Sequence, residues 1–169
     1  QHGDESFEHF DLTLYDENAR PKMERVFQVC RSFAQTFRPG TMNLLLQGGT
    51  GLGKTYLSAC IARVVAGAGY AVAYETAASA FDAFECAKFQ RGSAAGEAAA
   101  QRVEQTSALY TLINTRLTRA KATIISTNCS YEELQKKYTP QILSRIEGEY
   151  QTLPFVGRDI RQTKKEREA

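Results

Sequence analysis

The clearest chemical signal in this 169-residue sequence is a phosphate-binding motif. Residues 48–55 read G-G-T-G-L-G-K-T, which fits the pattern G-x-x-x-x-G-K-T. In such a loop, glycines let successive backbone N–H groups approach phosphate oxygens, a lysine reaches the β- and γ-phosphates, and a threonine hydroxyl holds Mg²⁺. The sequence therefore predicts that Lys54 contacts the terminal phosphates and that Thr55 is the metal-binding residue.

The other predicted contacts to the nucleotide are the main-chain groups of this loop and the residue after it. The full predicted set is Gly48, Gly49, Thr50, Gly51, Leu52, Gly53, Lys54, Thr55 and Tyr56. We expect the ligand to be ATP or ADP with Mg²⁺. A Gly-rich turn between two core elements is the alternative interpretation, and the elements on either side of the loop count against it.

Those elements are the ones that a phosphate-binding loop requires. The apolar run Asn43–Gln47 predicts a buried strand before the loop. Thr55–Val65 predicts an amphipathic helix after it, with Leu57 and Ile61 on the apolar side. The start of that helix adds a positive dipole end to the predicted phosphate site.

The rest of the chain alternates expected strands and helices. Before the motif, apolar residues at spacings of three and four predict a helix: Met23, Val26, Phe27, Cys30 and Phe33. Further strands are expected at Ala71–Glu75, Ala122–Ser126 and Tyr150–Phe155. Helices are expected at Ala78–Phe89, at Ser107–Leu117, after a capping box at Ser130–Glu133, and from Pro140 to a stop at Gly148. This order predicts an α/β fold with a parallel sheet covered by helices on both faces.

Composition narrows the class of protein. Hydrophobic residues make up 43% of the chain, enough for a real core, and no apolar run has the length of a membrane span. The four scattered cysteines and two histidines do not have zinc-site spacing, and free thiols fit a cytoplasmic protein. A net charge of +2 neither requires nor excludes a nucleic-acid partner.

An acidic residue is missing where hydrolysis would need one. ATPases with this motif place a carboxylate at the end of a neighbouring strand, where it orders Mg²⁺ and polarises the attacking water. None of the aspartates Asp4, Asp11, Asp16, Asp82 and Asp159 follows a strand-like run. Glu75 ends an expected strand, but a charged residue at a strand end is also common by chance.

The natural place for the missing strand is between the Gly-, Ala- and Glu-rich stretch Gln90–Gln105 and Ser107, where Val103–Thr106 is too short and too polar. Either the natural polypeptide carries further residues there, or the protein has no hydrolytic centre. We favour the first interpretation, because loss of a central strand would leave a gap in the sheet beside the phosphate loop.

Four motifs in order give the sequence a family resemblance. NLLLQGGTGLGKTYLSACIA, LYTLINTRL, ATIISTN and YTPQILSRIEGEYQTLPFVGRDIR resemble the bacterial helicase-loader ATPases of the DnaC and DnaI type. These are AAA+ proteins, close to the transposition helper IstB and the initiator DnaA. The resemblance covers Phe7 to Arg161 and implies a P-loop AAA+ sheet flanked by helices, with little or no C-terminal lid. The family's acidic strand, of the form L-L-I-I-D-D-L-G, is the main departure.

The resemblance implies roles for particular residues. Asn128 matches the polar sensor of the γ-phosphate, and a cap on the following helix is the alternative. Arg145 matches the arginine finger that reaches the nucleotide of a neighbouring subunit, and a surface arginine in an ion pair is the alternative. Arg158 and Arg161 match the lid-sensing position, or they belong to a solvated basic tail. Phe7–Phe10 matches the segment near the adenine, with core packing as an equal explanation.

A further segment matches the family's single-stranded DNA contacts. Phe84, Lys88, Phe89 and Arg91 combine aromatic and basic side chains, which suits base stacking and phosphate contact. Core packing is the alternative for the phenylalanines.

The resemblance also implies a function: ATP-dependent loading of the replicative DNA helicase onto single-stranded DNA, with hydrolysis if the acidic strand exists. The implied partners are the helicase, single-stranded DNA and further copies of the chain in head-to-tail contact. We expect one AAA+ ATPase domain over residues 1–169: an adenine-side segment (1–42), a P-loop core (43–161) and a basic tail (162–169). The helicase-binding region is expected to lie outside the chain. A transposition helper and a nucleotide-binding module without turnover remain as alternatives.

Overall fold

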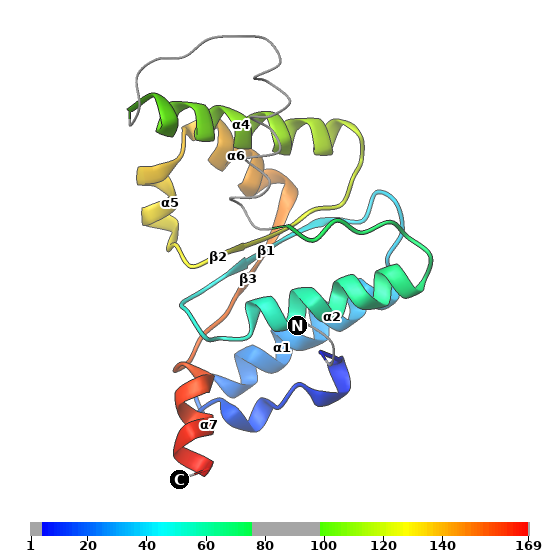
Figure 1. Ribbon diagram of the computed structural model, residues 1–169, viewed down its shortest axis with the longest axis vertical. Coiled ribbons are helices and arrows are strands. Elements are labelled where there is room, and N and C mark those ends of the chain that lie inside the picture. Colours follow the sequence, from blue (N-terminus) through cyan, green and yellow to red (C-terminus); the bar gives the residue numbers. More distant parts are fainter. Residues whose placement is uncertain (1–4, 76–98, 169) are drawn as a thin grey trace.

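A three-stranded parallel sheet organises the computed structural model, which describes residues 5–75 and 99–168. The strands are β1 (Asn43–Gln47), β2 (Ile124–Thr127) and β3 (Tyr150–Pro154), in the order β2-β1-β3. β1 is therefore central and pairs in parallel with both neighbours. Helices lie on both sides of this sheet (Figure 1).

β1 is apolar on both faces because helices cover both. Leu44 and Leu46 belong to one buried cluster and Leu45 to another, as the alternation of side chains along a strand requires. Asn43, at the start of β1, ties the strands together: its Oδ1 accepts from the Thr123 N–H at 2.8 Å, and its Nδ2 donates to the Glu149 carbonyl at 3.0 Å.

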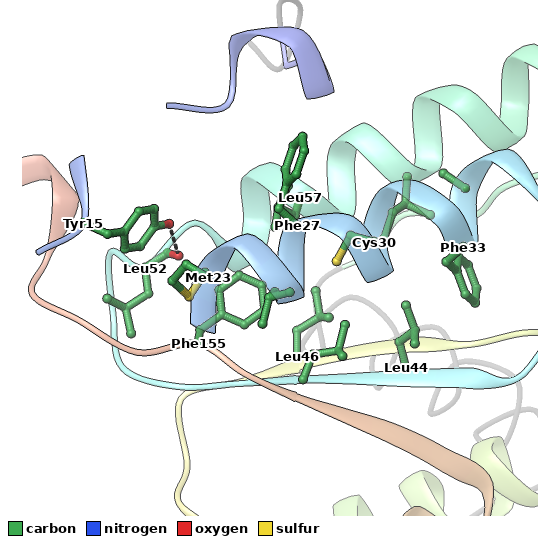
Figure 2. Packing of buried hydrophobic residues seen from close by; sticks show 14 of the residues in the cluster. Tyr15, Met23, Phe27, Cys30, Phe33, Leu44, Leu46, Leu52, Leu57 and Phe155 are labelled. Atoms are coloured by element: carbon green, nitrogen blue, oxygen red, sulfur yellow. Dashed lines mark hydrogen bonds between the residues drawn. The ribbon is translucent and has the colours of Figure 1, made fainter. Parts of the chain in front are cut away.

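Two helices cover the Leu44 and Leu46 face. They are α1 (Arg20–Gln35) and α2 (Lys54–Gly67), which pack against each other. α1 has proline in its first turn and buries Met23 and Cys30 completely. Figure 2 shows these side chains packed above Leu44 and Leu46 of the sheet, with Phe155 from beyond β3 beside them.

The other face carries α4 (Ala99–Thr118), α5 (Tyr131–Lys137) and α6 (Pro140–Glu149). Ile113 of α4 and Ile142 and Ile146 of α6 surround Leu45. α5 begins with the expected capping box, in which the Ser130 side chain accepts from the Glu133 N–H and the Glu133 carboxylate accepts from the Ser130 N–H.

The two ends of the described chain meet beside α1. The N-terminal segment forms two short 3₁₀ helices, η1 (Phe7–His9) and η2 (Leu12–Leu14), and the C-terminal segment forms α7 (Ile160–Glu168). The Arg167 guanidinium of α7 donates to the Thr13 carbonyl at 2.6 Å and to its hydroxyl at 3.0 Å. Figure 1 shows α7 next to the N-terminal segment, on the α1 side of the sheet.

The expected strand at Ala71–Glu75 is wrong. These residues are exposed and belong to no strand, although Tyr74 Oη lies 3.0 Å from Ser58 Oγ of α2. A strand of a parallel sheet needs a hydrogen-bonding neighbour and burial on both faces. Within the described residues, β2 is the outermost strand on one side, and no strand pairs with its outer edge.

Other element boundaries also differ from the expectation. α4 begins at Ala99 rather than Ser107, because the preceding alanine, glutamine, arginine and glutamate residues are good helix formers. α6 passes through Gly148 and ends at Glu149, and the basic tail at 162–169 is largely α7. β2 begins at Ile124, two residues after the expected start at Ala122. The expected helix Ala78–Phe89 lies outside the described residues.

The P-loop strand β1 has a paired strand on each side. Residues 44–47 of β1 pair with 124–127 of β2, and residues 43–47 pair with 150–154 of β3. The strand order leaves room for an additional strand only outside β2, whose side chains are at best half-buried, or outside β3, and not next to β1. The sheet beside the P-loop is therefore continuous as the chain stands, so packing next to β1 does not require further residues. Among the helices of the described residues, none is long and apolar enough to cross a bilayer.

Candidate nucleotide-binding site

Two positions of the loop between β1 and α2 require glycine, each because of a different neighbouring residue. Gly48 has φ of 152°, and a Cβ there would overlap the Phe155 carbonyl oxygen, which follows β3. Gly53 has φ of 87° and precedes α2, where a Cβ would lie 2.9 Å from Tyr15 Oη. The loop is thus pressed against both β3 and the N-terminal segment, and glycine is needed at both contacts.

Lys54 is the first residue of α2 and is 6% exposed. Its Nζ donates to the Gly48 carbonyl at 2.6 Å and to the Gly49 carbonyl. Burial lowers the pKa of this lysine, because the charged form loses solvation. The two carbonyls that accept from the Lys54 ammonium group are neutral, and a triphosphate would give it an anionic partner. Thr55 is exposed at the helix start, where its hydroxyl is accessible to a metal ion.

Tyr15 is a loop-supporting residue that the motif analysis missed. Its hydroxyl donates to the Leu52 carbonyl at 2.8 Å in a buried hydrogen bond (Figure 2). Burial raises the pKa of Tyr15, so the hydroxyl keeps its proton as a donor. Nothing in the spacing of Tyr15 and Leu52 along the chain signals this contact, because 37 residues separate them.

Asn128 and the P-loop come together at the carboxyl ends of β1 and β2. Asn128 Nδ2 lies 3.5 Å from the Thr50 hydroxyl oxygen, to which it donates. Gln47 Nε2 donates to the Cys129 carbonyl at 3.0 Å and so holds the turn after β2 beside the loop. The alternative role of Asn128 as a helix cap is wrong, because Ser130 caps α5. The sensor role stays a prediction, with geometry that fits it.

The start of α7 contacts the P-loop. The Ile160 N–H donates to the Gly51 carbonyl at 3.0 Å, and the Asp159 carboxylate packs directly against Gly51. Arg158 instead forms an exposed ion pair with Glu166 at 3.8 Å, and the exposed Arg161 donates its N–H to Asp159 at 2.9 Å. The lid-sensing role of Arg158 and Arg161 stays a prediction. Arg158 lies just before α7 and Arg161 in its first turn, and this helix contacts the P-loop through Ile160.

The aromatic N-terminal segment also lies beside the loop. Phe10 stacks on Phe27 at 5.4 Å between ring centroids and lies 5.6 Å from the ring of Tyr56. Phe7 packs edge-on against Phe27 at 5.8 Å. Both phenylalanines are half-buried, so core packing accounts for much of their role. The position of Phe10 against Gly53 also keeps the prediction of an adenine-side segment open.

Arg145 lies on the opposite side of the sheet from α2, because α6 packs with Ile142 and Ile146 against Leu45. Its guanidinium carbon is 5.6 Å from the centroid of the Tyr110 ring of α4. In the part of the chain that the structure describes, no carboxylate forms an ion pair with Arg145, which counts against the alternative of a paired surface arginine. The arginine-finger role is neither confirmed nor contradicted.

Residues 5–75 and 99–168 contain no catalytic carboxylate at a strand end. β1 ends at Gln47 and β2 at Thr127, and Glu75 is exposed outside any strand. Among the side chains that the structure describes, no three His, Cys, Asp or Glu residues form a group that could bind a metal ion. The predicted DNA contacts Phe84, Lys88, Phe89 and Arg91 lie outside the described residues.

Comparison with known proteins identifies the family. Residues 5–104 match the family described as IstB-like ATP binding protein, and the chain belongs to this family. A search of curated proteins gives no significant match.

Solved structures share the fold. The DnaC helicase loader is 16% identical with a TM-score of 0.73, covering 92% of this chain and 98% of that one. DnaI is 18% identical with a TM-score of 0.60, covering 92% and 89%. AMPPCP-bound DnaA from Aquifex aeolicus is 16% identical with a TM-score of 0.67, covering 97% of this chain and 53% of that one. The fold is therefore that of a P-loop AAA+ protein.

Proposed function

We propose that this chain is the ATP-binding AAA+ module of a protein that loads a replicative DNA helicase onto single-stranded DNA. The observation that carries the proposal is the meeting of a complete P-loop with Asn128 at the end of the adjacent strand. The fold likeness to the DnaC helicase loader over nearly the full length of both chains supports this choice of function.

Each residue of the site would make a different contact with the nucleotide or with Mg²⁺. Backbone N–H groups of the loop would bind the phosphates, and Lys54 would exchange its two carbonyl partners for phosphate oxygens. Bound Mg²⁺ would neutralise phosphate charge, with the Thr55 hydroxyl as its protein ligand. Asn128, already within reach of Thr50, would read the terminal phosphate.

Self-association would complete the site. Arg145 lies on the sheet face away from α2, so in a head-to-tail assembly it would act on the nucleotide of a second copy. ATP would then hold neighbouring copies together at the shared site, and its hydrolysis would loosen them.

The absence of a strand-end carboxylate within the described residues favours a second candidate, a nucleotide-dependent interaction module without turnover. The two candidates differ in one measurement, the release of phosphate from ATP at a protein concentration high enough for assembly. We propose ATP hydrolysis only for a polypeptide that supplies an acidic residue beside β2.

The family match favours a third candidate, a transposition helper that acts on double-stranded DNA. Salt-dependent binding separates this candidate from the loader, because contacts to phosphates weaken as salt rises. Salt-sensitive binding to single strands in preference to duplex supports the loader. Preference for duplex contradicts it.

Substitution of Lys54 tests the nucleotide site. Lys54→Ala should weaken ATP binding by roughly tenfold to hundredfold, since it removes a charged donor to the phosphates. Isothermal titration calorimetry measures the affinity, and circular dichroism checks that the fold is kept. Lys22→Ala, at an exposed lysine in the first turn of α1, is the matched control and should bind ATP normally. Unchanged affinity in the Lys54 variant would refute the P-loop assignment.

A further inference from the structure

We propose that Tyr110 is a positioning residue for Arg145: its ring holds the guanidinium ready for a phosphate of the nucleotide on a second copy of the chain. This inference rests on the proposed function, which gives Arg145 its role between subunits. It adds a residue on a different helix, α4, that the phosphate-binding motifs do not include.

The contact between Tyr110 and Arg145 lies directly beside the hydrophobic core around Leu45. Tyr110 is half-buried and packs against the cluster of Leu45, Ile113 and Ile142, so its ring is anchored. Arg145 is also half-buried, with its guanidinium carbon 5.6 Å from the ring centroid. The two side chains border a hollow of about 560 Å³ between α4 and α6, which is lined by Tyr110, Pro140, Gln141, Ser144, Arg145 and Glu149.

An aromatic partner suits an arginine that must bind phosphate later. A carboxylate would neutralise the guanidinium and occupy its N–H groups, and a phosphate would have to displace it. A ring face attracts the cation weakly, leaving the charge and the N–H edges available. Glu149 lines the same hollow, yet among the described residues no ion pair joins it to Arg145.

The placement also reduces the entropic cost of assembly. A free arginine loses rotamer freedom when it binds, and a side chain that already rests on an anchored ring loses less. Loss of the ring should therefore weaken nucleotide-driven assembly without changing nucleotide binding by a single copy, because the P-loop follows the carboxyl end of β1 and packs its Leu52 into the core on the other face of the sheet.

Sedimentation velocity with the non-hydrolysable nucleotide AMPPCP and Mg²⁺ tests the inference without requiring turnover. The variants are Tyr110→Phe, Tyr110→Leu, Arg145→Ala and the double variant Tyr110→Leu/Arg145→Ala. Tyr110→Leu should raise the protein concentration at half-assembly roughly threefold to tenfold, whereas Tyr110→Phe, which keeps the ring, should assemble normally. The double variant should match Arg145→Ala, because Tyr110 acts only through Arg145. Calorimetry on dilute protein should give all four variants the AMPPCP affinity of the unsubstituted chain.

Each other outcome contradicts a specific statement. Normal assembly of Tyr110→Leu beside defective Arg145→Ala overturns the positioning role alone. A Tyr110→Phe defect as large as that of Tyr110→Leu, or a double variant clearly worse than Arg145→Ala, shows a hydroxyl or packing role instead and also overturns it. Normal assembly of Arg145→Ala, or no assembly of the unsubstituted chain, overturns the proposed intersubunit site and the Tyr110 role with it.

Discussion

At the scale of a single residue, burial of Lys54 lowers the pKa of the side chain that we expect to bind the phosphates. Its ammonium group has neutral carbonyl partners and is 6% exposed, so the charged form is less favourable there than in water. The folded-state pKa is therefore below the ordinary value of 10.5. The unfolded chain binds more protons between these two pKa values, so the Lys54 contribution to folding stability becomes more favourable as pH rises through that window.

A bound triphosphate should reverse this shift, because phosphate oxygens favour the charged lysine. ATP binding should then take up a proton in the alkaline range below pH 10.5, and affinity should fall as pH rises through the lowered pKa. Calorimetry in two buffers of different ionisation enthalpy measures the proton uptake. Lys54→Arg is the control, since its guanidinium stays charged and should bind ATP without that uptake. Equal uptake by both proteins would contradict the assignment to Lys54.

At the scale of elements, the P-loop depends on β3 as much as on β1 and α2. The Phe155 N–H donates to the Gln47 carbonyl at 2.6 Å, and the Phe155 carbonyl lies where a side chain on Gly48 would have to be. The same loop contacts α7 through Ile160 and the N-terminal segment through Tyr15. Three elements from distant parts of the chain therefore set the shape of the loop.

Gly48→Ala should destabilise the protein and weaken ATP binding together. The new Cβ would collide with backbone atoms of Phe155 at a φ of 152°, and a shift of β3 or of the loop must follow, costing on the order of 1–3 kcal/mol. Thermal unfolding followed by circular dichroism measures the loss. Gly67→Ala is the matched control: it ends α2 with no atom within 4 Å of the added Cβ, so it should be neutral or slightly stabilising. Equal stability of the two variants would contradict the close approach.

At the scale of the whole molecule, one sheet joins two cores. Leu46 faces the core under α1 and α2, and its neighbour Leu45 faces the core under α4 and α6. Both side chains are almost fully buried, with exposed fractions of 0% and 4%. Because β1 contributes to both cores, loss of packing on either face should affect the same folding unit.

Leu45→Ala and Leu46→Ala should each lower the free energy of unfolding by about 2–5 kcal/mol, and each should leave a single transition. Circular dichroism reports the helices, and tyrosine fluorescence reports the surroundings of the eight tyrosines, since the chain has no tryptophan. The two signals should change at the same temperature in both variants. A variant in which one signal changes well before the other would show that the faces unfold independently.

The sequence by itself determined the local parts of this protein. The P-loop, the strand before it and the helix after it were predicted from contiguous residues, and β1 has the predicted bounds Asn43–Gln47. The capping box at Ser130 and the proline start of α6 were predicted for the same reason. Such signals are readable because the interacting groups are only a few residues apart.

Only the tertiary structure decided which distant residues meet. The contacts of Tyr15 with Leu52, Ile160 with Gly51, Asn128 with Thr50 and Arg145 with Tyr110 join different elements, and no local pattern encodes them. The same holds for Ala71–Glu75, whose sequence suits a strand. A strand requires a hydrogen-bonding neighbour, and the described sheet ends at β2. Local propensity proposes an element, and the partners that folding places beside it decide whether it forms and what its side chains can do.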